Sequence, residues 1–223
     1  MSRSTSPFVR KARKVQKLIS NLVVQEDGFD APPKIVCGLD VSYVKNKGIA
    51  GAVCLSYESL EVLERSHAVV DVTFPYIPTL LAFRELRPIV VAYKKLKLRP
   101  DVVFVDAQGY AHPYRCGLAC HFGVVTNTPT VGVAKKKLYG VEVPYKNMFL
   151  LKDPKTSEIV GASYPIGGGR KLYISVGHMV SLDTAIKLVV DLVSRGNGVF
   201  PPTQLAHQLV TELRRSLKSG EIR

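Results

Sequence analysis

Residues 101–113 constrain the fold of this chain more than any other stretch. They begin with four apolar residues at 102–105, continue through Asp106 and a turn of small residues, and end with His112 and Pro113. An apolar run of this length, rich in valine, is typical of a buried strand. An acid at the carboxyl end of such a strand is a common catalytic or metal-binding position in α/β folds, although it can also merely cap a turn. The positions of the other acids decide between these interpretations.

The remaining sequence predicts a mixed α/β fold. Consecutive strands at 35–43, 49–57 and 60–72 are expected to form an antiparallel meander. Further strands are predicted at 129–134, 148–151, 158–163 and 172–176, and helices at 7–24, 80–98, 114–125, 181–194 and 202–217. Thr79 and Ser181 are the expected N-caps of two of these helices. This order favours one α/β domain over 1–223, with a core over about 35–194 between terminal helices at about 7–24 and 202–217.

The charge balance indicates a polyanionic partner. Lys and Arg number 31 against 18 Asp and Glu, a net charge of +13, and nucleic acid is the first candidate for such an excess. The alternative is a charge that only keeps the protein in solution. The predicted helix at 7–24 is basic on one face and carries Val15, Leu18, Ile19 and Leu22 on the other. We expect this apolar face to cover the sheet while the basic face either stays solvated or touches phosphates.

The hydropathy pattern argues against two other classes of protein. No apolar run approaches the roughly 18 residues that span a bilayer. The basic N-terminal segment has no apolar stretch behind it of the kind that marks a secretory signal. We therefore expect a cytoplasmic protein that has no membrane partner and acts as a monomer.

The cysteines allow a zinc site but do not favour one. Cys37 and Cys54 lie in apolar, strand-like runs and are expected in the core. Cys116 and Cys120 are four residues apart and close to two histidines, which are zinc-ligand types. A structural zinc site usually needs a second closely spaced pair, and the sequence has none. Two thiols on one face of a helix are the simpler interpretation.

Three acids suggest a site for a divalent cation. Asp40 interrupts the apolar strand at 35–43, and a buried, unpaired carboxylate there would be unfavourable. If this strand lies beside the one that ends at Asp106, the two carboxylates are close and their repulsion requires a cation. Glu85 is the candidate third ligand. Carboxylates suit Mg²⁺, and on a basic protein they suggest metal-assisted phosphodiester hydrolysis. The alternative is that both aspartates bind loop amides and Glu85 lies on the surface.

Five local motifs carry a resemblance to a known family. In chain order they are 38–42, 74–78 with 83–85, 105–106 with Gly109 and 112–113, 132–135, and 175–178. Together they resemble the endonuclease V family, the deoxyinosine-directed nucleases of ribonuclease H-like fold. The resemblance covers about 36–192. It implies an α/β ribonuclease H-like architecture with a mixed sheet flanked by helices.

The resemblance also implies an activity and a set of catalytic residues. The activity is Mg²⁺-dependent hydrolysis, with Mn²⁺ as a substitute, of the second phosphodiester bond 3′ to a deaminated adenine in DNA, leaving 3′-hydroxyl and 5′-phosphate ends. Asp40, Glu85 and Asp106 match the metal ligands. The other matching catalytic positions are His178 near the metal, Lys135 near the scissile phosphate and His112 in the active-site loop.

A proline-rich segment matches the part of the family that enters the duplex. Tyr76 matches the wedge beside the lesion, in the run Pro75, Tyr76, Ile77, Pro78. The two prolines stiffen this run, so that little entropy is lost on insertion. Gly109 is expected to let backbone amides approach the base.

Three residues depart from the family pattern near the expected base pocket. Thr79 and Ala107 stand where the family commonly has glycine, and Tyr114 stands where it commonly has arginine, with Arg115 one position later. These departures bear on the shape of the pocket and on the strictness of inosine selectivity. Inosine-containing RNA or other structured nucleic acid is the alternative substrate. A non-catalytic nucleic-acid-binding module is disfavoured because all three acids are present.

Overall fold

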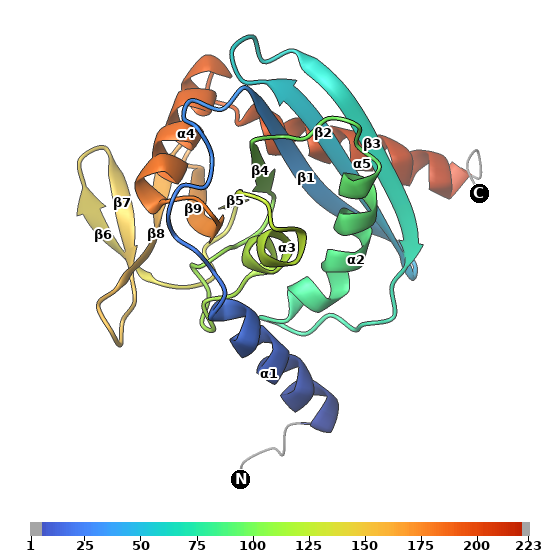
Figure 1. Ribbon diagram of the computed structural model, residues 1–223, viewed down its shortest axis with the longest axis horizontal. Coiled ribbons are helices and arrows are strands. Elements are labelled where there is room, and N and C mark those ends of the chain that lie inside the picture. Colours follow the sequence, from blue (N-terminus) through green and yellow to red (C-terminus); the bar gives the residue numbers. More distant parts are fainter. Residues whose placement is uncertain (1–5, 220–223) are drawn as a thin grey trace.

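A nine-stranded mixed sheet runs through the computed structural model, which describes residues 6–219 (Figure 1). Its order is β3-β2-β1-β4-β5-β9-β8-β7-β6. The strands are β1 Ile35–Val44, β2 Lys47–Ser56, β3 Val62–Asp71, β4 Val102–Val105, β5 Thr130–Ala134, β6 Val141–Tyr145, β7 Met148–Lys152, β8 Ile159–Pro165 and β9 Lys171–His178. Strands β1, β4 and β5 are parallel neighbours, and the other neighbouring pairs are antiparallel. The expected ribonuclease H-like mixed sheet and its three-strand meander are confirmed.

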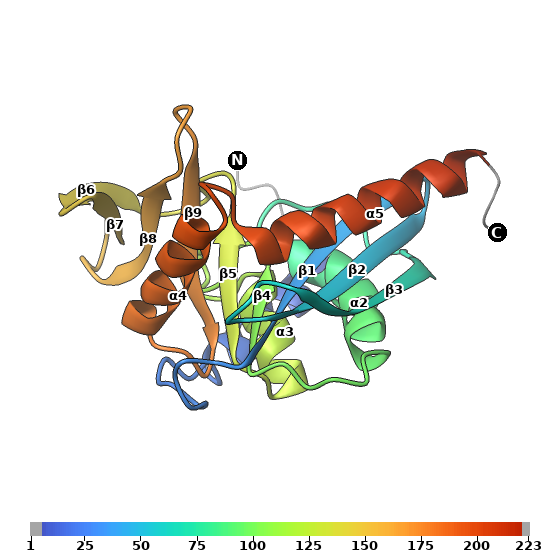
Figure 2. The same ribbon diagram turned by 90° about the horizontal axis from the view of Figure 1, so that it is seen from above.

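Helices cover both faces of the sheet (Figure 2). They are α1 Pro7–Ser20, α2 Leu81–Lys94, α3 Leu118–Thr126, α4 Leu182–Arg195 and α5 Pro201–Ser219. One apolar core joins α4 and α5 to the sheet, and a second joins α2 and α3 to the opposite face. Helix α1 contacts α3 and projects from the edge of the molecule (Figure 1).

Strand β4 lies at the centre of both cores. Val102 and Phe104 point toward α4 and α5, while Val103 and Val105 point toward α2 and α3. Side chains alternate between the faces of a strand, so a strand covered on both sides must be apolar throughout. This explains the uninterrupted apolar run that ends at Asp106.

The register of β1 and β4 fixes the position of the two aspartates. Leu39 on β1 is paired in parallel with Val105 on β4, so the next residues, Asp40 and Asp106, lie side by side where β4 ends. Gly38 allows α5 to approach this place closely, because a Cβ there would lie 1.9 Å from the carbonyl oxygen of Pro202. The start of α5 therefore packs directly on β1.

Helix α1 differs from the expectation in length and in orientation. It ends at Ser20 rather than near residue 24. Its buried residues are Ala12 and Gln16, whereas Val15 is 37% exposed and Leu18 is 65% exposed. The prediction that the apolar face covers the sheet is wrong, because polar side chains attach this helix to the rest of the protein.

Three other local predictions need correction. Thr79 does not cap α2: it has a φ of +68°, and the N-cap position is Leu80. Helix α3 begins at Leu118 rather than near 114, because the preceding residues form the loop that follows β4. Strand β6 was not predicted; it is mostly exposed, contains Pro144 and lies at the edge of the sheet. Ser181 does cap α4, accepting a hydrogen bond from the backbone of Thr184.

Within residues 6–219, none of the helices combines the length and the apolar character that crossing a membrane requires.

Candidate active site

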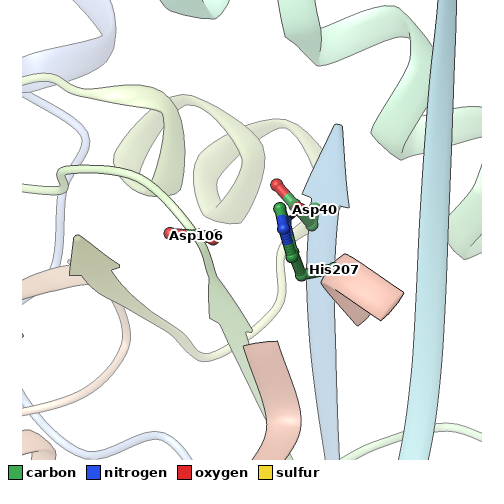
Figure 3. Close-up of side chains that lie close together, drawn as sticks. All are labelled: Asp40, Asp106 and His207. Atoms are coloured by element: carbon green, nitrogen blue, oxygen red, sulfur yellow. Dashed lines mark hydrogen bonds and ion pairs between the residues drawn. The ribbon is translucent and has the colours of Figure 1, made fainter. Parts of the chain in front are cut away.

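Two aspartates and a histidine meet where β4 ends beside the middle of β1 (Figure 3). One potential ligand atom from each of Asp40, Asp106 and His207 lies within 4.8 Å of the other two. Nδ1 of His207, on α5, is 2.7 Å from Asp40 Oδ2, and the backbone N–H of Val41 donates to Asp40 Oδ1 at 2.8 Å. Asp40 therefore has His207 and the Val41 amide as partners, whereas Asp106 is paired with a lysine.

That lysine is Lys135, which follows β5. Its Nζ lies 2.5 Å from Asp106 Oδ2. Strand β5 is the parallel neighbour of β4, so Lys135, the first residue after β5, lies at the same end of these strands as Asp106. The side chain of Lys135 is half exposed, which leaves its ammonium group accessible to an anion.

Glu85, on the second turn of α2, lies outside this close group but near enough for its charge to be repelled by both aspartates. It is buried and accepts a hydrogen bond of 3.0 Å from the hydroxyl of Tyr43. Burial raises the pKa of Glu85 to about 7, despite the Tyr43 hydrogen bond, and repulsion from Asp40 adds to the rise. Burial, followed by repulsion from Asp106, raises the pKa of Asp40 to about 6. Burial and the neighbouring acids therefore both disfavour the charged forms of Asp40 and Glu85.

These residues fit a divalent cation. Asp40 and Asp106 supply the oxygen ligands that Mg²⁺ and Mn²⁺ prefer, and Glu85 is a further carboxylate close by. The raised pKa values of Asp40 and Glu85 are consistent with a site that favours additional positive charge. His207 adds a nitrogen that can bind an ion or hold Asp40 in position. Among the residues that the structure describes, no other group of three or more His, Cys, Asp and Glu ligand atoms is this close.

A hollow of about 460 Å³ opens beside the acids. Asp106 and Lys135 belong to its wall, so it is continuous with the acidic group. Other lining residues come from the segment between β3 and α2, from the loop after β4, from α3 and from the segment after β5: Tyr76, Thr79, Leu81, Ala82, Ala107, Gln108, His112, Cys116, Gly117, Leu118, Ala134, Lys136, Lys137 and Leu138. Its volume is in the range of small-molecule sites.

The proline loop, residues 74–80, forms one rim of this hollow. Tyr76 is 68% exposed, and Pro75 and Pro78 are exposed beside it. Ile77 is half-buried, and its carbonyl accepts a hydrogen bond from the backbone of Leu80 at 2.9 Å. The loop therefore presents its aromatic side chain to solvent while its base is anchored.

His112 lies in the wall of the hollow and is almost fully buried. Burial lowers its pKa to about 4, and the nearby positive charge of Arg13 lowers it further. Nδ1 of His112 is 3.1 Å from the backbone nitrogen of Tyr114, which donates to it. His112 is therefore neutral near pH 7 and can offer one N–H to a bound group.

The structure does not bring His178 to the acids. Strand β9 runs antiparallel to β5 and pairs His178 with Thr130, at the start of β5 and so at the opposite end of that strand from Lys135. Nδ1 of His178 accepts a hydrogen bond from the backbone of Val24 at 3.2 Å. His207 occupies the place near the acids that the sequence interpretation gave to His178. The sequence signal for His207 is weak: it is a lone histidine beside buried Ala206 in an amphipathic helix.

Two residues of the loop after β4 have structural contacts instead of facing the hollow. The backbone N–H of Gly109 donates to Ser175 Oγ at 2.9 Å, and a Cβ there would lie 2.1 Å from the carbonyl oxygen of Val176. Gly109 therefore permits close packing on β9, and its amide is not free to bind a base. Arg115 forms ion pairs with Asp153 and Glu158, next to the β7–β8 turn.

The cysteines do not form a metal centre with the histidines. Cys116 and Cys120 are both buried, and burial raises the pKa of each thiol. They are absent from the one close group of potential ligands that the described residues contain. The zinc alternative is therefore set aside.

The fold and this site define a nuclease of ribonuclease H-like architecture. A family model described as Endonuclease V matches residues 17–208. The endonuclease V of Thermofilum pendens is 38% identical over 216 residues, covering 93% of this chain and 89% of that protein. The crystal structure of the Streptomyces avermitilis endonuclease V superposes with a TM-score of 0.82 at 33% identity, covering 96% and 94% of the two chains. The chain belongs to the endonuclease V family.

A third relative has been crystallised with nucleic acid. The endonuclease V of Ciona intestinalis superposes with a TM-score of 0.80 at 25% identity, covering 94% of this chain and 99% of that one. Its structure contains a 24mer DNA with an inosine followed by a ribo-adenosine.

Proposed function

We propose that this protein is a Mg²⁺-dependent endonuclease that recognises deoxyinosine in DNA. It hydrolyses the second phosphodiester bond 3′ to the lesion and leaves 3′-hydroxyl and 5′-phosphate ends. The observation that carries the proposal is the continuity of the acidic group with a hollow large enough to admit a base, through Asp106 and Lys135. A single site can then hold a displaced base and act on a nearby phosphate.

The acids and their neighbours have distinct roles in this reaction. Asp40, Asp106 and Glu85 would hold the ion, and a bound divalent cation would supply a lowered pKa for water and positive charge beside the phosphate. Substrate phosphate competes with Asp106 for the ammonium of Lys135, which then stabilises the oxyanion. His207 orients Asp40 through the contact between its Nδ1 and Asp40 Oδ2.

Recognition requires the lesion base to leave the stack. Extrusion costs a few kcal/mol, and an exposed aromatic residue can fill the gap it leaves. Tyr76 is suited to this because it stands exposed on a stiff loop at the rim of the hollow. The extruded base then lies against Ala107 and Thr79, and His112 offers a hydrogen bond to its edge.

A second hollow supports a path for the strand beyond the acids. It has a volume of about 530 Å³ and shares Lys135 with the first. Arg170 and Lys171 also line it, as does Thr203, which lies one helical turn before His207. Basic side chains next to a nuclease site attract the phosphates of the substrate strand.

The experiment that tests the proposal compares matched duplexes containing hypoxanthine or adenine at one position. We expect nicking one nucleotide beyond the lesion nucleotide in the hypoxanthine duplex, with Mg²⁺ or Mn²⁺ and not with chelator. Equal nicking of both duplexes would contradict lesion recognition. Nicking that persists in excess chelator would contradict the assignment of the acids as metal ligands.

Inosine-containing RNA is a second candidate substrate. The DNA in the Ciona relative carries a ribo-adenosine directly after the inosine, so a 2′-hydroxyl is accommodated at that position in that protein. The test replaces only the nucleotide 3′ to hypoxanthine with its ribonucleotide. Faster cutting of the ribo substrate would favour RNA, and equal or slower cutting would favour DNA.

A further inference from the structure

Helix α1 contacts the proline loop at both ends of the loop. The ring of Phe8 lies 4.8 Å from that of Phe74, centroid to centroid. At the other end, Arg13 donates to the hydroxyl of Thr79 at 2.5 Å and to its carbonyl at 3.1 Å, and Gln16 donates to the same carbonyl at 2.9 Å. The loop that carries Tyr76 is therefore braced by a helix outside the core.

Thr79 needs such support because of its backbone conformation. Its φ of +68° lies in the left-handed region, which is unfavourable for a β-branched residue. The three hydrogen bonds from Arg13 and Gln16 stabilise this conformation, and Thr79 Oγ1 also donates to the carbonyl of Pro78 at 2.5 Å. Without the bonds from α1, the end of the proline loop would have easier access to other conformations.

The same two residues of α1 also contact the loop after β4, which supplies another part of the lining of the hollow. Gln16 is 1% exposed, and its Nε2 donates to the carbonyl of Cys116 at 2.8 Å. The guanidinium of Arg13 lies over the ring of Tyr114, 4.0 Å from its centroid, and donates to Gln16 Oε1 at 2.8 Å. Thr79 and Cys116 line the hollow, whereas Arg13 and Gln16 do not. One buried amide thus joins two segments of the lining, the proline loop and the loop after β4.

We propose that Arg13 and Gln16 are positioning residues that fix the width of the base pocket, so that inosine selectivity depends on α1. This rests on the proposed function, because it assigns the hollow to the lesion base. Both residues precede the region that the family model matches, which begins at residue 17. Selectivity is therefore set in part by side chains that never touch the substrate.

The physical basis is preorganisation. Hypoxanthine and adenine are nearly the same size and differ at position 6, an oxygen acceptor against an amino donor, and at N1, an N–H donor against a nitrogen acceptor. A pocket can separate them only if its own polar groups are held at fixed positions, since a loosened wall can adapt to either base. Fixing Thr79 and Cys116 relative to each other supplies that rigidity.

The test measures kcat and KM on the hypoxanthine and adenine duplexes for Arg13→Lys and Gln16→Leu. Arg13→Lys keeps the charge but loses the forked contact with Thr79. We expect selectivity, the ratio of the two kcat/KM values, to fall by about tenfold in each variant, mainly through KM for hypoxanthine. Lys14→Ala is the matched control, because it removes a charge from the exposed face of the same helix and should change both substrates equally.

Selectivity equal to that of the unmodified protein in both variants would overturn the proposal. If kcat/KM falls equally on the two duplexes and the Tm of the variant is lower, the role of these residues is merely structural. That result would also overturn the proposal.

Hydrogen exchange separates this inference from the proposed function. The amide of Leu80, bonded to the carbonyl of Ile77, reports on the closure of the proline loop without any substrate. In Gln16→Leu it should exchange about tenfold faster, while amides of β4 keep their protection. Unchanged exchange at Leu80 would contradict the claim that Gln16 stabilises the proline loop, independently of which substrate the protein cleaves. If the brace is present but hypoxanthine is not preferred, the proposed function fails instead.

Discussion

At the scale of single residues, the proposed catalysis depends most on Asp40 in β1 and on Asp106 just after β4. Asp40→Asn or Asp106→Asn should lower single-turnover cleavage of the hypoxanthine duplex by about a thousandfold or more, because charge stabilisation worth several kcal/mol is lost with the ion. Duplex binding, measured by fluorescence anisotropy, should persist. Asp71→Asn is the matched control, since this acid is exposed and contacts only Lys47, at 3.5 Å. Cleavage by either site variant near the unmodified rate would remove that aspartate from the metal site.

Buried histidine side chains predict how stability depends on pH. Burial lowers the pKa of His121 from 6.5 to about 4, and its Nδ1 has no hydrogen-bond partner among the described residues. The unfolded chain then binds a proton more readily than the folded one. The contribution of neutral His121 is complete above pH 6.5 and is lost as the pH falls toward 4.

The free energy of unfolding should therefore decline over that interval and decline less in His121→Leu. Urea unfolding at several pH values measures both slopes. Equal slopes in the two proteins would contradict the buried neutral state. His112, whose pKa is also about 4, accounts for part of the decline that remains.

At the scale of elements, β4 links the active site to the core. Phe104 is fully buried and packs edge-on against Phe200, just before α5, at a centroid distance of 5.1 Å. Phe104→Ala should reduce the free energy of unfolding by about 3–5 kcal/mol, as measured by urea denaturation. Leu63→Ala, at a 47% exposed position on β3, should cost less than about 1 kcal/mol. A loss at Phe104 as small as that at Leu63 would contradict a tightly packed junction between β4 and α5.

The central strands and the proline loop are the parts of the structure that could be predicted from the sequence. The central strands were predictable because burial on both faces demands continuous apolar residues, and an acid at the end of such a run stands out. Asp40 and Asp106 follow directly from this pattern once β1 and β4 are neighbours. The proline loop was also readable, because two prolines restrict the backbone locally.

The errors come from long-range contacts that no local pattern records. His207 reaches the acids only because α5 crosses β1 at Gly38, whereas His178 is carried away by the antiparallel direction of β9. Gly109 was expected to face a base but packs on β9. The apolar spacing of α1 indicated one face for burial, but the hydrogen bonds of Gln16 and Arg13 determined another.

At the scale of the whole molecule, a net charge of +13 should make binding to nucleic acid strongly salt-dependent. Affinity for a short duplex should fall by about a thousandfold between roughly 50 mM and 200 mM salt, as expected for about six phosphate contacts. The slope should be similar with and without hypoxanthine, because phosphates rather than bases supply it. Salt-independent binding in anisotropy titrations would contradict a charge-driven interface.

The central claim is that the acidic group and the adjacent hollow form one site for a nucleotide strand. A crystal structure with a hypoxanthine duplex and Ca²⁺ in place of Mg²⁺ tests it most directly. We predict an ion about 2.3–2.6 Å from oxygens of Asp40 and Asp106. We also predict the hypoxanthine base between Thr79 and Cys116, with Tyr76 in the gap it leaves. A hypoxanthine that remains stacked in the duplex, or an ion bound away from both aspartates, would contradict the account.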